Sequence, residues 1–154
     1  MEKIQNQKHT KETFYFAFSR MFERASYYGF RALIILYMVG ETLNMETAEA
    51  IKIYGWLIGS LVFSQIIGAL FGDLLIGNRK SVIIGGIIQA VGIFILCIPS
   101  TIGLYLGLFI IVLGNGFFTP NITSSFGKLY LNKNKLLDSG FTIFYLAINL
   151  GSFL

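Results

Sequence analysis

The run "IYGWLIGSLVFSQIIGALFGDLLIG", residues 53–77, decides what kind of protein this chain is. Apart from Asp73 near its end it carries no charged side chain, and it exceeds the roughly 20 apolar residues that a helix needs to cross a bilayer. Further long apolar runs occupy 81–98, 102–118 and 139–154. Such recurring runs predict a chain that lies mostly within a membrane.

The overall composition leads to the same class. Hydrophobic residues make up 55% of the 154 residues and charged residues 13%, about half the usual share of charge in a soluble domain. Strands of about ten residues with alternating polarity, which a membrane β-barrel requires, are absent from the sequence. We therefore expect an all-α fold, a polytopic membrane helical bundle.

Several function classes lose support at this stage. The formal net charge of +4 is spread along the chain and does not form one basic patch, so a nucleic-acid partner is not expected. The sequence shows no His/Cys cluster for a metal and no nucleophile–base pair. His9 lies in a polar tail and is expected to be solvated. We expect neither an enzyme nor a cofactor.

The apolar pattern predicts five helices after a polar cytoplasmic tail, residues 1–12. The fifth predicted helix is short for a span and reaches the last residue. We therefore expect residues 13–154 to be a partial bundle, whose partners include the lipid bilayer and the missing transmembrane helices of the same protein. The five expected helices cover about 13–39, 51–77, 80–98, 102–126 and 139–154.

The distribution of Lys and Arg in the short connections predicts the orientation. The tail and the connections at 78–80 and 128–138 together hold eight of them, whereas the opposite side holds only Lys52 beside three glutamates. Basic connections stay in the cytoplasm. We expect a multi-pass protein of the cell (inner) membrane with a cytoplasmic amino terminus and Glu41–Glu49 outside. The eight basic residues are Lys3, Lys8, Lys11, Arg79, Lys80, Lys128, Lys133 and Lys135.

A charged stretch, "RMFERASYYGFR" at 20–31, interrupts the first apolar segment. Its polar residues have the spacing of one helix face, and Glu23 and Arg24 would lie near the bilayer centre. A charge there costs at least about 2.5–3.5 kcal/mol, so this face must meet protein or a water-filled cavity. A purely structural ion-pair network is one interpretation, and a net positive site for an acidic substrate is the other. The face comprises Arg20, Glu23, Arg24, Tyr27 and Arg31, with Tyr28 beside it.

Four segments, taken together, resemble the proton-dependent oligopeptide transporter family of the major facilitator superfamily. "FERASYYG" at 22–29 is similar to its first-helix signature E-x-x-E-R-F-x-Y-Y-G. "GALFGDLLIGNRK" at 68–80 resembles the loop motif of the superfamily, "GNGFFTPNIT" at 114–123 the fourth-helix motif, and "DSGFTIFYLAINLGSFL" at 138–154 the fifth-helix signature. The four segments occur in the order of the family and cover about the first third of a member.

The resemblance implies part of a secondary active transporter that moves di- and tripeptides with protons by alternating access. Short peptides and protons would then be its partners. Arg24 would bind the peptide carboxylate or pair with Glu23, and Tyr27 and Tyr28 would contact the peptide. Asn149 would hydrogen-bond the peptide backbone. Packing remains an alternative for the tyrosines, and interhelical hydrogen bonding for Asn149.

The resemblance also assigns residues to charge balance and to a gate. Glu23 would carry the proton. The sequence departs from the family at Arg20, which replaces the first glutamate of the signature, and at Thr119, which replaces a lysine. These departures leave proton coupling open, and Arg20 would supply the missing cation.

At the cytoplasmic loop, Asp73 with Arg79 and Lys80 would form a gate of charge pairs. An ordinary positive-inside loop is the alternative there. A carrier of another small anion and a non-transporting membrane module that associates with a full-length carrier also remain open.

Overall fold

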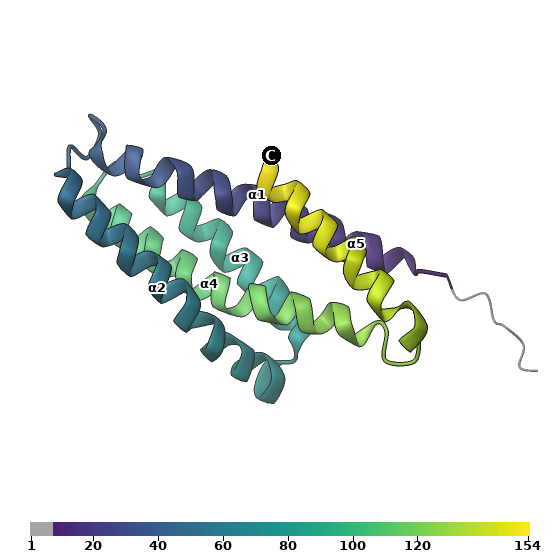
Figure 1. Cartoon of the computed structure of the whole chain (residues 1–154). Coiled ribbons are helices and arrows are strands. Elements are labelled where there is room, and N and C mark those ends of the chain that lie inside the picture. The colour runs from purple at the N-terminus through teal and green to yellow at the C-terminus, as the bar shows by residue number, and fades with distance from the viewer. Residues whose placement is uncertain (1–7) are drawn as a thin grey trace, which may run out of the picture. The chain divides into compact units, whose positions relative to one another are not determined.

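The computed structural model describes residues 8–154, and over this range the chain is helical without a strand (Figure 1). The fold class predicted from the sequence is confirmed. Lys3 and the first seven residues of the predicted tail lie outside the described residues. The elements are α1 (Lys11–Val39), α2 (Thr47–Phe71), a π-helical turn η1 (Gly72–Ile76), α3 (Asn78–Leu96), α4 (Thr101–Lys128) and α5 (Asn134–Phe153).

Four helical segments of the described chain are long and apolar enough to cross a membrane. They are Thr47–Ile76, Asn78–Leu96, Thr101–Lys128 and Asn134–Phe153. The first helix, α1, is also long, with 29 residues, but its charged stretch lowers its mean hydropathy. Polar side chains in a membrane helix face protein or water, so α1 has the composition of a helix that lines a polar interior.

The helix ends differ from the ranges expected from apolarity. The second helix starts at Thr47 instead of near 51, and the fifth starts at Asn134 instead of near 139. In both cases a polar first turn precedes the apolar run, "TAEA" in α2 and "NKLLD" in α5. Apolarity marks where a helix enters lipid, whereas backbone hydrogen bonding extends beyond that point.

The described chain divides into two compact units. Unit 1 joins the chain up to Gly29 with Ser124–Leu154, and unit 2 is Phe30–Thr123. The core of unit 1 is aromatic, and Phe126 stacks on Phe144 with ring centroids 4.5 Å apart. A Cβ on Gly151 of α5 would meet the backbone of Met21 in α1, so these helices pack in close contact.

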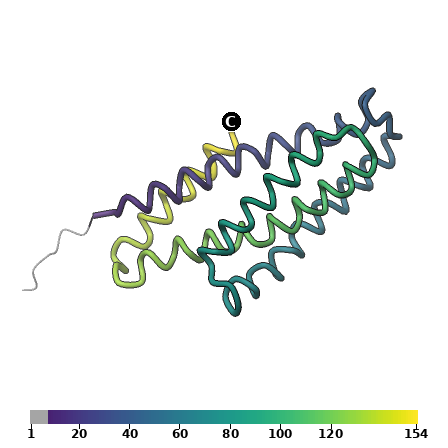
Figure 2. The backbone as a smooth tube through the Cα atoms, turned by 180° about the vertical axis from the view of Figure 1, so that it is seen from behind, coloured from purple at the N-terminus to yellow at the C-terminus, as the bar shows by residue number. Residues whose placement is uncertain are grey.

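In unit 2, α2, α3 and α4 run side by side (Figure 2). Small residues lie where these helices touch. A Cβ on Gly68 of α2 would overlap the backbone of Gly116 in α4, and one on Gly85 of α3 would come within 2.7 Å of the carbonyl of Gly114. Backbones approach this closely only where side chains are minimal. Glycine at these positions therefore allows α2, α3 and α4 to pack closely.

Candidate functional site

The charged face of α1 in unit 1 is an ion-pair cluster centred on one carboxylate. Arg20 Nη1 donates to Glu23 Oε2 at 2.8 Å. Arg24 approaches the same carboxylate with two donors, Nε to Oε2 at 2.7 Å and Nη2 to Oε1 at 2.6 Å. The three side chains are 7%, 10% and 13% exposed in chain order. Two guanidinium groups thus share one largely buried carboxylate, and the cluster carries one net positive charge.

The helical repeat explains one of the two pairs, because Arg20 lies one turn before Glu23 on the same helix face. Arg24 is the next residue after Glu23, and its long side chain bends back so that its planar fork meets both carboxylate oxygens. This bidentate geometry is available to arginine and not to lysine. The Nε/Nη2 edge of Arg24 is therefore occupied by Glu23, and another carboxylate can take this edge only when Glu23 gives it up.

Two tyrosines extend the cluster along α1. The guanidinium carbon of Arg24 lies 4.5 Å from the ring centroid of Tyr27, which is a cation–π contact. The rings of Tyr27 and Tyr28 meet edge to face, with centroids 5.3 Å apart. Tyr28 remains 40% exposed. The face of Arg24 is therefore covered by an aromatic ring, whereas Tyr28 presents a surface that another molecule or helix can contact.

The fifth helix brings Asn149 into the same unit. Gly151, two residues further on, packs against Met21 and the side chain of Arg24, so this end of α5 lies beside the charged cluster. Asn149 lines a shallow cavity of about 410 Å³ on α5. The polar lining of this cavity offers an amide, two hydroxyls and a carboxylate for hydrogen bonding. Its lining residues are Asp138, Phe141, Thr142, Tyr145, Leu146 and Asn149.

The remaining residues of the predicted stripe and of the charge-balance set lie in unit 2. Both Nε and Nη2 of Arg31 donate to the hydroxyl of Tyr54, at 2.9 and 2.8 Å. Thr119 is half-buried in α4, and its carbonyl accepts a hydrogen bond from Thr123. The structure therefore gathers Arg20, Glu23 and Arg24 in one cluster, and it holds Arg31 by a separate set of contacts.

The predicted gate residues lie where α2 gives way to α3. Asp73 is in η1, and Arg79 and Lys80 are exposed in the first turn of α3. Over the range that the structure describes, Asp73 makes no ion pair with Arg79 or Lys80. Its Oδ1 instead accepts a hydrogen bond from Asn78 at 2.7 Å. The sequence-based interpretation missed Asn78, whose only signal was a polar residue between a glycine and the basic pair.

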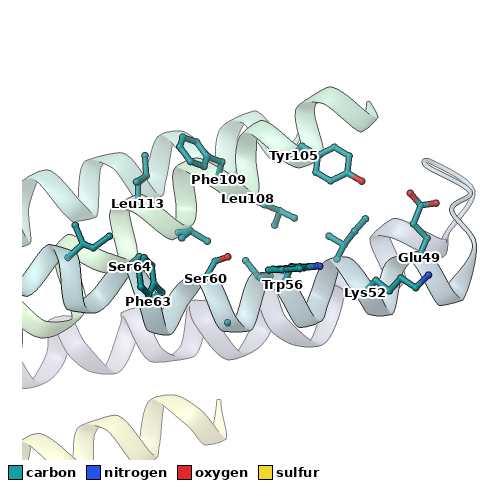
Figure 3. Close-up of a pocket in the computed structure, with 15 residues that line it drawn as sticks. Glu49, Lys52, Trp56, Ser60, Phe63, Ser64, Tyr105, Leu108, Phe109 and Leu113 are labelled. Carbon is teal, nitrogen blue, oxygen red and sulfur yellow. The ribbon is translucent and has the colours of Figure 1, made fainter.

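A second, apolar cavity of about 730 Å³ lies between α2 and α4 in unit 2 (Figure 3). Trp56 and Phe63 of α2 and Tyr105 and Phe109 of α4 line it, with Glu49 and Lys52 at one end. The sequence analysis did not predict this cavity, because its two walls come from segments about 50 residues apart. Its few polar groups suit an apolar occupant and offer little for binding a charged substrate.

His9 corrects one expectation. It is half-buried in unit 1, and its Nδ1 is 3.0 Å from the hydroxyl of Tyr130, which also bonds Thr13 at 2.7 Å. Its Nε2 is 3.3 Å from the hydroxyl of Ser139. The prediction of a solvated His9 is wrong, because contacts more than 120 residues away in sequence hold it.

Within residues 8–154, no group of three His, Cys, Asp or Glu side chains is arranged to hold a metal ion.

Comparison with known proteins places this arrangement in a family. The profile of the POT family (PTR2) matches residues 79–154. The uncharacterized transporter YclF of Bacillus subtilis (strain 168) is 38% identical over 152 residues, which cover 95% of this chain and 31% of that protein. A di-/tripeptide transporter of Lactococcus lactis subsp. lactis (strain IL1403) is 36% identical over 142 residues, covering 87% of this chain and 28% of that protein.

The fold is shared as well. The crystal structure of a POT family transporter in complex with a thioalcohol-conjugated peptide superposes on 93% of this chain with a TM-score of 0.87 and 32% identity, and the match covers 30% of that transporter. The chain thus spans about 30% of the length of the relatives it matches. Profile, sequence identity and fold thus all relate this chain to members of the POT family.

Proposed function

We propose that this chain forms part of a secondary transporter that carries di- and tripeptides together with protons across the cell membrane. The observation that carries the proposal is the carboxylate of Glu23 held between Arg20 and Arg24 in a largely buried cluster. The Lactococcus lactis relative is a di-/tripeptide transporter, which supports the choice of substrate.

The carboxylate of Glu23 and the carboxylate of a peptide would compete for the same guanidinium group, that of Arg24. When Glu23 is ionised, it occupies the fork of Arg24. Protonation of Glu23 removes the charge that holds the fork, and Arg24 is then free to pair with the carboxylate of a peptide. Because a peptide carboxylate offers the same two oxygens, it replaces Glu23 with little change in geometry.

The exchange also limits the charge that the cluster carries in its largely buried setting. The ionised cluster carries one net positive charge, and a proton on Glu23 raises it to two. Binding the carboxylate end of a peptide at Arg24 returns the charge of this cluster to one, and the ammonium end of the peptide would lie outside the cluster. Proton and peptide therefore favour each other's binding, which is the coupling that a symporter needs.

The other proposed contacts fit the ends and the middle of a short peptide. Asn149 offers both a donor and an acceptor to the peptide backbone from the cavity on α5. Tyr28, which is partly exposed, offers a hydroxyl and a ring, and Tyr27 completes the wall through its contact with Arg24. Arg20 is proposed to stand in for the cation that Thr119 does not supply.

The orientation and the gate are part of the same proposal. The excess of basic residues in the tail and in two connections supports a cytoplasmic amino terminus in the inner membrane. Asp73, Arg79 and Lys80 would then lie at the cytoplasmic surface. There they would form charge pairs in one conformation and separate in the other, which is how alternating access closes one side at a time.

The experiment uses a carrier in which this chain replaces the corresponding residues of the Lactococcus lactis transporter, reconstituted in liposomes. An imposed proton gradient should drive accumulation of a labelled dipeptide. Unlabelled di- and tripeptides should compete, free amino acids should not, and a protonophore should abolish accumulation. Competition by small anions and not by peptides would show that the site serves another anionic substrate.

A further inference from the structure

Two buried asparagines in unit 2 form a hydrogen-bonded chain that ends on Asp73. Asn121 of α4 is 1% exposed and Asn78 of α3 is 6% exposed. Burying an amide without partners is costly, so each amide is expected to make specific contacts. Hydrogen bonds of these two amides connect the crossing of α2 and α4 with a single carboxylate.

The hydrogen-bonded chain of the two asparagines begins where α2 and α4 touch. The Nδ2 of Asn121 donates to the carbonyl of Gly68 in α2 at 2.9 Å and to that of Phe117 in its own helix at 2.8 Å. Both hydrogens of this amide are thus used on backbone. A Cβ on Gly72 would overlap the amide of Asn121, so glycine at that position is what allows Asn121 to reach α2.

The second link runs through Asn78. With the two hydrogens of its amide, Asn78 Nδ2 donates to Asn121 Oδ1 at 2.8 Å and to Asp73 Oδ1 at 2.7 Å. Both N–H groups of the Asn121 amide bond backbone carbonyls, so its Oδ1 is the atom that accepts from Asn78. These hydrogen bonds all form together in only one orientation of each amide. This orientation fixes the direction in which Asn78 donates to Asp73.

The backbone around Asp73 explains why its carboxylate needs a hydrogen-bond partner to hold one orientation. Asp73 sits in the π-helical turn η1, and a single residue, Gly77, separates η1 from α3. Gly77 has φ +86°, a conformation that favours glycine. Asp73 itself is exposed. A carboxylate on an exposed turn next to a glycine would sample many orientations without a partner, and Asn78 is the partner that reduces them.

We infer that Asn78 and Asn121 are positioning residues that hold the Asp73 carboxylate in a fixed orientation at the junction of α2 and α3. The geometric part of this inference stands on the hydrogen bonds alone. Its role in transport rests on the proposed function, in which Asp73 must meet a cationic partner once in every cycle. A preoriented carboxylate forms such a pair with less loss of conformational freedom.

The test measures how fast a water-soluble carbodiimide and an amine tag modify Asp73 in the complete 154-residue chain, quantified by mass spectrometry. Asn78→Leu keeps a similar volume and removes both donors. It should speed modification of Asp73 by on the order of tenfold, the change in an equilibrium that corresponds to one hydrogen bond to a charged group. Asn121→Leu, which does not touch Asp73, should act in the same direction, because Asn78 then loses its orienting acceptor.

Two controls separate positioning from general loosening. Asp138, an exposed carboxylate in α5, serves as the internal standard and should keep its rate in every variant. Asn132→Leu replaces an exposed asparagine between α4 and α5 and should leave Asp73 unchanged. Equal rates at Asp73 in the parent, Asn78→Leu and Asn121→Leu would overturn the inference, as would a parallel rise at Asp138. A rise in Asn78→Leu alone would overturn the part assigned to Asn121.

Transport by the reconstituted carrier gives the functional readout. Asn78→Leu should lower the maximal rate of peptide exchange while KM stays near that of the parent, because the peptide site lies in unit 1 and the variant alters a gate. A matching rise in Asp73 reactivity with unchanged exchange would overturn the role in transport. Failure of the parent carrier to move peptides would refute the proposed function and leave the labelling result intact.

Discussion

Glu23 bonds both Arg20 and Arg24, and this makes it the first residue to test for proton coupling. We expect Glu23→Gln in the grafted carrier to abolish proton-driven accumulation more than it weakens exchange of peptide for peptide. A glutamine keeps the shape but cannot release a proton. Uptake with and without an imposed gradient measures the difference, and Glu12→Gln, in the first turn of α1, is the control. Unchanged accumulation would place the proton site outside this chain.

We also expect the effects of substitutions at Arg20 and Thr119 on peptide uptake to be coupled. Arg20→Glu alone would put a second carboxylate beside Glu23 in place of a cation, and one of the two would tend to stay protonated, so activity should fall. Arg20→Glu with Thr119→Lys restores both positions of the family pattern and should recover activity. Peptide uptake by the two single variants and the double variant should be non-additive, by about 0.5–3 kcal/mol. Additive losses would show that Arg20 acts independently of position 119.

How much of the site the sequence predicts depends on the distance between its members. The spacing of Arg20, Glu23 and Arg24 predicts one helix face, and the structure gathers them. Asn78 and Asn121 escaped prediction because they are 43 residues apart and meet only where helices cross. The prediction for His9 was wrong for the same reason, since its partners Tyr130 and Ser139 are more than 120 residues away in the sequence.

At the scale of helices, the closest approach of α2 and α4 gives a prediction about stability. We expect Gly68→Ala to lower the free energy of unfolding by about 1–3 kcal/mol, because its Cβ would overlap the backbone of Gly116. Gly59→Ala is the matched control, since a Cβ there meets no atom within 4 Å and alanine favours the helix. Thermal unfolding in detergent compares the two. Equal midpoints would contradict the close crossing.

Helix number and class follow from apolar runs, which the sequence displays directly. Helix ends are harder to predict from the sequence, as the polar first turns of α2 and α5 show. Apolarity indicates which residues contact lipid, and it does not indicate how far the helical hydrogen bonding extends. The π-helical turn Gly72–Ile76 has no sequence signal of its own. It depends on how α2, α3 and α4 meet, and so it requires the tertiary structure.

At the scale of the whole molecule, the charge distribution predicts the side of the membrane on which each connection lies. In single-cysteine variants in which Cys97, an exposed residue, is replaced by serine, a membrane-impermeant maleimide added outside the cell should modify Glu46→Cys and spare Lys133→Cys. Permeabilised cells should label both positions. The opposite pattern in intact cells would reverse the orientation.

We expect the cluster on α1 to bind the carboxylate of a peptide through Arg24, and a competition measurement can detect this binding. Uptake of a labelled dipeptide by the reconstituted carrier is challenged with the unlabelled dipeptide and with its C-terminal amide. The free acid should compete roughly tenfold better, as expected for one charge-assisted bidentate pair, and Arg24→Ala should bring the two competitors to equal strength. A preference for the free acid that persists in a transporting Arg24→Ala variant would contradict the claim.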